Sequence, residues 1–184
     1  MNETKAIDAR DVQRLRAETG AGVMDCKRAL EESAGDFDKA RESLRQRGLS
    51  AAAKRAGREA REGIVESYIH AGGRIGALVE VNSETDFVAR GEEFRQLARN
   101  IAMQVAAMSP LVISEDDLTP EAKAELLKEH GDEKKALEAA VLLKQPYIRD
   151  NTKTIGDLVT ALAAATGENV QVRRFARFQL GAAA

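Results

Sequence analysis

Several residue types are scarce in this sequence of 184 residues, and each scarcity argues against a class of protein. The single cysteine, Cys26, cannot form a disulfide within the chain, so a reducing compartment is expected. Tryptophan is absent and aromatic residues make up 4% of the chain, which leaves little material for stacking on nucleic-acid bases. No apolar run approaches the ~20 residues that span a bilayer, and residues 1–5 lack the features of a signal or transit peptide. A cytoplasmic protein without a membrane partner is expected.

A surplus of charge of either sign is also lacking. The chain has 28 Lys and Arg residues against 30 Asp and Glu residues, so its formal net charge is −2. Direct binding of nucleic acid requires a concentration of cations that neutralise phosphates, and this balance argues against it. The 43% of hydrophobic residues are enough for a core, and the 32% of charged residues are typical of a water-exposed surface. These totals suit a protein that recognises another protein.

The first 50 residues contain three short stretches with helical periodicity. The first ends at Gly20, the second is expected over residues 24–33, and the third is expected to end before Gly48. Helices this short bury little surface individually, so they should pack together. We therefore predict a small three-helix domain over residues 1–50, followed by a basic, alanine-rich linker helix over residues 51–61.

After Gly63 the helical period gives way to the alternation that is typical of strands. Two such runs flank a Gly-Gly turn and predict an antiparallel hairpin, to which a closing strand is expected to return. The expected elements are strands over 64–70, 75–81 and 169–180, amphipathic helices over 92–108 and 154–165, and exposed helices within 114–133. The sequence thus predicts an α+β core domain with a small antiparallel sheet over residues 62–184.

Strict alternation along the closing strand predicts the residues on its two faces. Val172, Arg174 and Phe178 are expected on one face, and Arg173 and Phe175 on the other. This strand mixes cations with aromatics as an RNA-binding strand does. A structural strand is the favoured interpretation, because the two phenylalanines fall on opposite faces.

The sequence contains no zinc-ligand spacing, phosphate-loop motif or nucleophile elbow. Residues 19–22 are glycine-rich, but no strand precedes them and a turn between helices is favoured. Glu80, Glu84 and Asp86 are possible ligands for Mg²⁺, although solvated carboxylates are the favoured interpretation. Cys26 is expected to be a half-buried apolar residue rather than a reactive thiol.

The most informative stretch is residues 84–90, directly after a predicted strand and before a predicted helix. It holds the apolar pair Phe87 and Val88 between Asp86 and Arg90. Large apolar residues on an exposed connection require an explanation. Two remain open from the residues alone, namely a hydrophobic staple that fixes the helix entry and a wedge that enters a partner.

In several stretches the sequence resembles the bacterial elongation factor Ts family, the nucleotide-exchange factors for elongation factor Tu. The matching stretches are residues 15–30, 35–36, 44–45, 48–49, 80–90, 142–147, 167–170 and 173–178. They occur in order over nearly the whole chain, and the Thr-Asp-Phe-Val-Ala run in its strand-to-helix context is highly specific.

The resemblance implies three regions of contact with elongation factor Tu. A ubiquitin-associated-like N-terminal domain would contact the partner's nucleotide domain, although Val23 replaces the methionine usual there. A second segment would intrude beside the nucleotide and dislodge Mg²⁺, and the hairpin tip would contact the partner's other side. The implied residues are Arg16, Thr19, Gly20, Gly22 and Met24 in the first region, Thr85, Asp86, Phe87 and Val88 in the second, and His70, Gly73, Arg74 and Gly76 in the third.

The resemblance also implies a function and an assembly. The expected function is guanine-nucleotide exchange in translation elongation, without covalent chemistry and without a cofactor. One copy of the core resembles the short form of the family, in which two chains pair, so a homodimer is expected. The alternative is a ubiquitin-associated-like adaptor that binds protein or RNA without promoting exchange.

Overall fold

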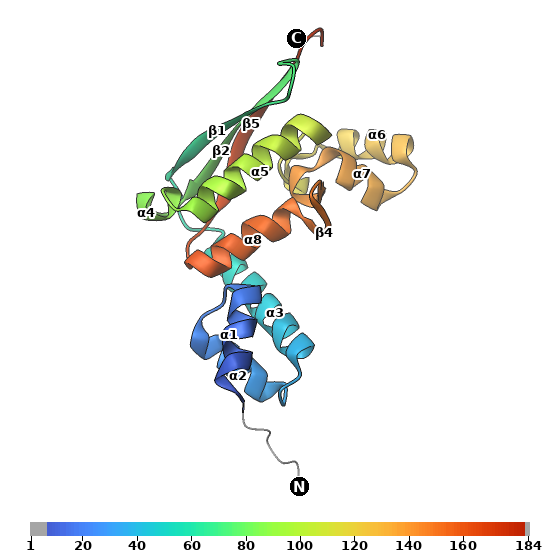
Figure 1. The fold of residues 1–184 in the computed structure, drawn as a ribbon. Helices are drawn as coiled ribbons and strands as arrows, with labels where there is room; N and C mark the ends of the chain where they lie inside the picture. The colour runs from blue at the N-terminus through green and yellow to red at the C-terminus, as the bar shows by residue number, and fades with distance from the viewer. Residues whose placement is uncertain (1–6, 183–184) are drawn as a thin grey trace.

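The computed structural model describes residues 7–182. The chain is an α+β protein with a helical bundle at one end and a sheet packed against helices at the other (Figure 1). The predicted fold class is therefore confirmed. The bundle consists of α1 (Ala9–Thr19), α2 (Val23–Glu32) and α3 (Phe37–Arg55).

Local sequence accounts for the ends of these helices. The Asp8 carboxylate accepts the Arg10 N–H (3.0 Å) at the start of α1, and Asp36 accepts the Lys39 N–H (3.1 Å) at the start of α3. Gly20 ends α1 in a left-handed conformation (φ +68°) that favours glycine. The three helices enclose a core of their own, formed by Val12, Leu15, Cys26, Ala29, Leu30, Ala40 and Leu44.

The prediction that the third helix ends before Gly48 is wrong, because α3 continues to Arg55. Gly48 lies where α3 meets α8 (Ile155–Thr166), and a Cβ added there would be 3.2 Å from Ala164 Cβ. A glycine inside a helix costs about 1 kcal/mol relative to alanine, and here it permits the close approach of α8. Helix α3 thus includes residues 51–55 of the expected linker helix, and residues 56–61 lie outside it. The division into domains stays a prediction.

The second unit is built on three antiparallel strands, β1 (Glu62–Ile69), β2 (Ile75–Ser83) and β5 (Gln171–Gln179), in the order β1-β2-β5. The predicted hairpin and the predicted return of the last strand are both confirmed. Helix α5 (Glu92–Met108) packs on one face of the sheet (Figure 1). The larger side chains of this core include Val79, Val81, Phe94, Leu97, Ile101, Val105, Ile155 and Val159.

A β-bulge changes the faces of β5. Glu80 lies opposite Arg174, but Val81 lies opposite Val172, so Arg173 is an extra residue in β5. Val172 therefore shares the α5-facing side with Phe175, and the prediction that it shares a face with Arg174 is wrong. The prediction that Phe175 and Phe178 lie on opposite faces is confirmed. Phe175 is opposite Val79 in the core, and Phe178 lies on the exposed face.

The remaining elements connect these layers. They are α4 (Asp86–Ala89), η1 (Glu115–Asp117), α6 (Pro120–His130), α7 (Glu133–Ala140), η2 (Leu142–Lys144), β3 (Pro146–Tyr147) and β4 (Asp150–Thr154). Helix α6, every residue of which is described, buries none of its side chains fully, as expected for the exposed helices within residues 114–133. Over residues 7–182, none of the helices combines the length and apolar content required to cross a membrane.

Candidate partner-binding site

A single helical turn presents Phe87 to solvent between β2 and α5. Phe87 lies in α4 and is 83% exposed, the largest exposed fraction among the large apolar side chains in the part of the chain that the structure describes. Its neighbour Val88 is half-buried and packs against the main core, and Ala89 is buried. An exposed side chain cannot act as a staple, so inward packing falls to Val88 and Phe87 stays available for a partner.

The ends of α4 are held by short polar contacts. Thr85 is its N-cap, and the Thr85 hydroxyl oxygen accepts the Val88 N–H at 3.4 Å. The Ser83 hydroxyl donates to the Thr85 carbonyl oxygen at 2.9 Å. At the other end, Asp86 and Arg90 form an ion pair of 2.8 Å on the surface. These contacts fix the turn that carries Phe87.

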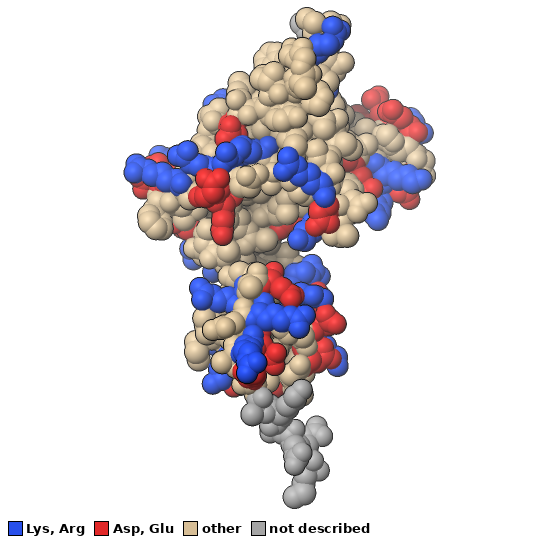
Figure 2. Space-filling model, viewed as in Figure 1, with Lys and Arg blue, Asp and Glu red and all other residues tan. Residues whose placement is uncertain are grey.

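An open hollow lies beside Phe87. Its volume is about 590 Å³, and it is bounded by α4, the start of α5 and the last turns of α8. Val88, Phe94 and Leu162 supply apolar lining, and Asp86 and Arg90 supply charge at the rim. Figure 2 shows side chains of both signs around α4 and the start of α5. An apolar floor with a charged rim is the usual composition of a protein-binding surface.

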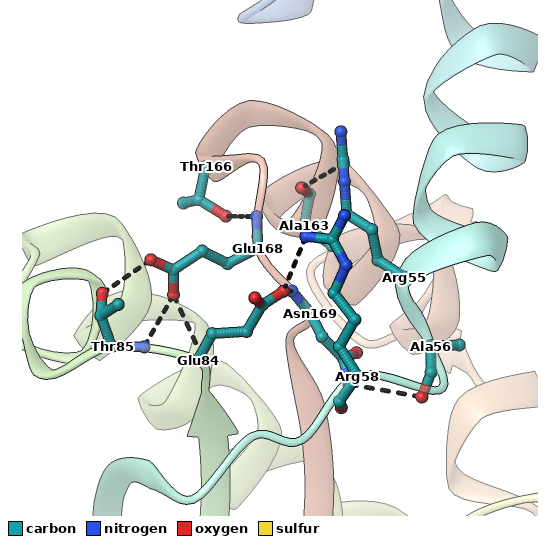
Figure 3. Close-up of polar contacts among 9 residues, drawn as sticks. All are labelled: Arg55, Ala56, Arg58, Glu84, Thr85, Ala163, Thr166, Glu168 and Asn169. Carbon is teal, nitrogen blue, oxygen red and sulfur yellow. Dashed lines mark hydrogen bonds and ion pairs between the residues drawn. The ribbon is translucent and has the colours of Figure 1, made fainter.

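Two carboxylates join the α4 segment to the connection between α8 and β5 (Figure 3). Glu168 accepts the main-chain N–H groups of Glu84 (3.1 Å) and Thr85 (3.0 Å) and the hydroxyl of Thr85 (2.6 Å). In return, Glu84 accepts the main-chain N–H of Asn169 at 2.6 Å. The Glu168 carboxylate therefore binds the main chain at residues 84 and 85, and the Glu84 carboxylate binds the main chain at residue 169.

The same junction reaches the segment that leaves α3. The buried Asn169 side chain donates to the carbonyl oxygens of Ala56 (3.3 Å) and Arg58 (2.7 Å), and Arg58 is paired with Glu84 at 3.5 Å. Sequence reasoning included residues 167–170 in the family resemblance but gave Glu168 and Asn169 no role. Nothing local marks them, because their partners lie more than 80 positions away along the chain.

The predicted N-terminal contact residues surround the turn between α1 and α2. The Thr19 hydroxyl donates to the Leu15 carbonyl oxygen (2.7 Å) and accepts the Ala21 N–H (3.3 Å), which shapes the turn. Gly22 caps the start of α2. Met24 is 67% exposed there, while Arg16 and Gly20 are also exposed. The sequence-predicted residues of this region therefore share one turn.

The predicted hairpin residues surround the tip of β1 and β2. The Tyr68 hydroxyl lies 3.2 Å from His70 Nδ1, and Gly73 adopts a left-handed conformation (φ +67°). The Arg74 carbonyl oxygen accepts the Leu180 N–H at 2.8 Å, so the C-terminal strand supports the tip. Gly76 lies where an added Cβ would be 2.7 Å from the Ile69 side chain.

The three predicted regions do not converge into one site. The α1–α2 turn belongs to the bundle, α4 lies at one end of the sheet, and the hairpin tip lies at the other end (Figure 1). Figure 2 shows that the surface around the hairpin is mostly uncharged on the side in view. A partner that contacts all three regions must therefore extend along the length of the molecule.

The face of the sheet opposite α5 carries exposed apolar side chains beside the Glu80–Arg174 ion pair. Leu78 and Phe178 project from it on neighbouring strands, where Gly76 pairs with both Ile69 and Phe178. We call this face the sheet patch. It comprises Val65, Ile69, Leu78 and Phe178, which are between 45% and 67% exposed. A patch of this kind is typical of a surface that another protein covers.

The residues considered for metal or thiol chemistry do not form a site. Glu80 pairs with Arg174 at 2.6 Å, and this hydrogen bond lowers the pKa of Glu80 below its usual value. Glu84 and Asp86 take other partners, and among residues 7–182 no group of three or more His, Cys, Asp or Glu side chains is placed to hold a metal ion. Cys26 is fully buried in the bundle core, where it packs as an apolar residue.

Comparison with known proteins identifies the family of this chain. Residues 9–130 match the model of the family described as "Elongation factor TS". Elongation factor Ts of Caldanaerobacter subterraneus is 50% identical over 95% of this chain and 97% of its own length. The chain belongs to the elongation factor Ts family.

Relatives from other lineages agree with this assignment. Elongation factor Ts of Carboxydothermus hydrogenoformans is 49% identical over 95% of this chain and 89% of its own length. A chloroplastic elongation factor Ts of Rhodomonas salina is 50% identical with the same coverage of each chain. Membership of the elongation factor Ts family supports a role as a translation elongation factor.

Proposed function

We propose that this chain is a guanine-nucleotide exchange factor for elongation factor Tu, and that it promotes GDP release by disturbing the Mg²⁺ and phosphate site of that partner. The observation that supports this most is the exposure of Phe87 at 83% on a single anchored helical turn. Family membership agrees with it, because the relatives are named elongation factors Ts. Such a factor would act in the cytoplasm and would need no cofactor.

The proposed action of Phe87 is mechanical. Burial of a phenylalanine side chain in a cleft of the partner would contribute about 2–3 kcal/mol. That free energy would stabilise a conformation in which the partner's Mg²⁺ ligands are displaced. Since Mg²⁺ bridges the phosphates and helps to retain the nucleotide, its displacement speeds GDP release without breaking a covalent bond. Asp86, beside Phe87, would bring a negative charge close to the same phosphates.

The other two regions would supply affinity and orientation. Met24 and Arg16 beside the α1–α2 turn offer an apolar and a cationic contact to the partner's nucleotide domain. His70 and Arg74 at the hairpin tip would contact a second surface of the partner. Exchange then follows from coupling, because the factor by which this protein weakens GDP binding equals the factor by which GDP weakens the binding of this protein.

We further propose that two copies pair through the sheet patch. Its side chains come from three adjacent strands and stay exposed, although they are as apolar as core residues. An interface of this kind would be symmetric, with the same patch on both copies. Pairing would leave α4 free, because α4 lies at the end of the sheet and α5 occupies the face opposite the patch (Figure 1).

Release of a fluorescent GDP analogue from elongation factor Tu, followed by stopped flow, tests the proposed exchange activity. The protein should accelerate release in a saturable manner, and Mg²⁺ in excess should oppose the effect. Binding to elongation factor Tu without acceleration would favour the adaptor interpretation and would reject the exchange function.

A further inference from the structure

Helix α4 is too short to be stable by itself. It comprises four residues, Asp86–Ala89, and isolated helices shorter than about 12–15 residues are marginal in water. The direction in which Phe87 points therefore depends on what holds the two ends of the turn. At the C-terminal end, buried Ala89 and the Asp86–Arg90 ion pair do so.

At the N-terminal end the principal anchor is Glu168. Its carboxylate accepts three hydrogen bonds from two consecutive residues, the N–H groups of Glu84 and Thr85 and the hydroxyl of Thr85. Hydrogen bonds to a charged acceptor are stronger than those between neutral groups. The same Thr85 hydroxyl oxygen caps α4 by accepting the Val88 N–H. The Thr85 hydroxyl thus connects the Glu168 carboxylate directly to the turn that carries Phe87.

Glu168 is itself held in place. The left-handed Gly167 (φ +74°) ends α8 and turns the chain toward α4. The Glu168 N–H donates to the Thr166 hydroxyl oxygen (3.4 Å), and the next residue, Asn169, is buried and bound to the carbonyl oxygens of Ala56 and Arg58. Figure 3 shows the Glu168 side chain extending from this turn to Thr85. Glu168 is half-buried in the connection between α8 and β5, and these contacts hold it in place.

We infer that Glu168 is a positioning residue for nucleotide exchange, whose carboxylate sets the orientation of α4 and so aims Phe87. This inference rests on the exchange function proposed above. Glu168 need not touch the partner, because it acts through Thr85 and the main chain. Removal of its carboxylate should leave the α1–α2 turn and the hairpin tip intact, so the loss should fall on the rate of release and not on binding.

The test compares Glu168→Ala and the isosteric Glu168→Gln with Glu129→Ala, which removes a carboxylate from the exposed surface of α6. We expect Glu168→Ala to lower the maximal rate of GDP release from elongation factor Tu about fivefold, with less than a twofold change in the concentration for half-maximal effect. Glu168→Gln keeps an oxygen acceptor and should retain an intermediate rate, even if the alanine variant folds poorly. Glu129→Ala should match the unsubstituted protein.

A second readout does not require the partner. Amide hydrogen exchange of residues 84–91 in the free protein should accelerate in Glu168→Ala, while the amides of α5 keep their protection. In the Phe87→Ala background, Glu168→Ala should cause no further loss of rate, because Glu168 acts through Phe87.

The possible failures are distinguishable. If the unsubstituted protein does not accelerate GDP release, the proposed function is rejected, and with it a role of Glu168 in exchange. If the unsubstituted protein is active and Glu168→Ala is equally active, only the role of Glu168 is overturned. The same holds if Glu168→Ala lowers the rate of GDP release as much in the Phe87→Ala background as in the unsubstituted protein. Unchanged amide exchange at residues 84–91 would overturn it as well.

Discussion

Phe87 and Val88 are adjacent in one helical turn and lie in opposite environments. Val88 packs against the main core, whereas Phe87 is 83% exposed. Consecutive helical side chains point about 100° apart, so the turn directs Val88 and Ala89 toward the core and Phe87 toward solvent. In the proposed exchange function, Val88 would attach the segment to the fold and Phe87 would be presented to the partner.

Truncation of each residue of this pair should therefore affect a different property. Phe87→Ala should lower the maximal rate of GDP release by tenfold or more, because about 2–3 kcal/mol of burial is lost, and should leave the melting temperature unchanged. Val88→Ala should lower the free energy of unfolding by about 1 kcal/mol. Thermal melts and stopped-flow release measure the two effects.

Leu111 is a matched control for Phe87, because it is 65% exposed and lies outside the three predicted contact regions. Leu111→Ala should not change the rate of GDP release. An unaltered rate in Phe87→Ala would count against the proposed action of Phe87.

The sheet patch predicts a dimer that a single charge disrupts. Phe178→Asp places a carboxylate within the patch, where pairing would bury it without a partner. Sedimentation should find dimers of the unsubstituted protein at micromolar concentration and monomers of Phe178→Asp, whereas Leu111→Asp should remain dimeric. A monomeric unsubstituted protein would refute pairing through this face.

The contact between α3 and α8 predicts a size limit at position 48. A Cβ added at position 48 would already lie 3.2 Å from Ala164 Cβ, so the larger valine side chain would crowd α8. Gly48→Val should therefore lower the melting temperature. Ala164→Gly in the same chain should restore part of the loss. Gly57→Val is a suitable control, since nothing lies within 4 Å of a Cβ at that position. Equal melting temperatures for Gly48→Val and Gly57→Val would contradict this account of the contact.

Acid should weaken the bundle partly through Glu42 of α3. Hydrogen bonds from Arg45 and Gln46 lower the pKa of Glu42 from its usual 4.5 to about 2. A carboxylate with a lowered folded-state pKa adds stability above its unfolded pKa and loses it as the pH falls through the folded value. The melting temperature of Glu42→Gln should therefore fall less between pH 4.5 and acid unfolding than that of the unsubstituted protein.

The effect at Glu42 should be small, because the group is exposed and salt screens it. Added salt should reduce the difference between Glu42→Gln and the unsubstituted protein. If the melting temperatures of both proteins fall in parallel with pH at low salt, the hydrogen bonds of Glu42 do not contribute to stability.

Sequence patterns predicted those elements whose cause is local. Helix α5 occupies residues 92–108 as its apolar spacing predicts, and the glycine turn correctly marks the hairpin. The end of α3 was not predictable, because the feature that permits a glycine there is a helix more than 100 positions away. The bulge at Arg173 was hidden for a similar reason, since alternation assumes an unbroken register and the partner strand sets the register.

The residues of the candidate site also fall into those that the sequence indicated and those that only the fold reveals. Phe87 was identified because a large apolar residue beside charges is conspicuous in the sequence. Glu168 and Asn169 were not, because an isolated Glu-Asn pair after a glycine indicates only the end of a helix. What makes them important is the set of main-chain groups that the fold brings within reach.

The junction of Glu84, Glu168 and Asn169 has a consequence for distances across the molecule. Because it joins the segment after α3, the start of α4 and the end of α8, the spacing between the helical bundle and Phe87 is set by hydrogen bonds instead of by a free linker. The fold therefore holds the helical bundle and Phe87 at a fixed separation. In the proposed complex, a partner whose two surfaces move apart would lose one of the two contacts, and the timing of dissociation would then follow the partner's own conformational change.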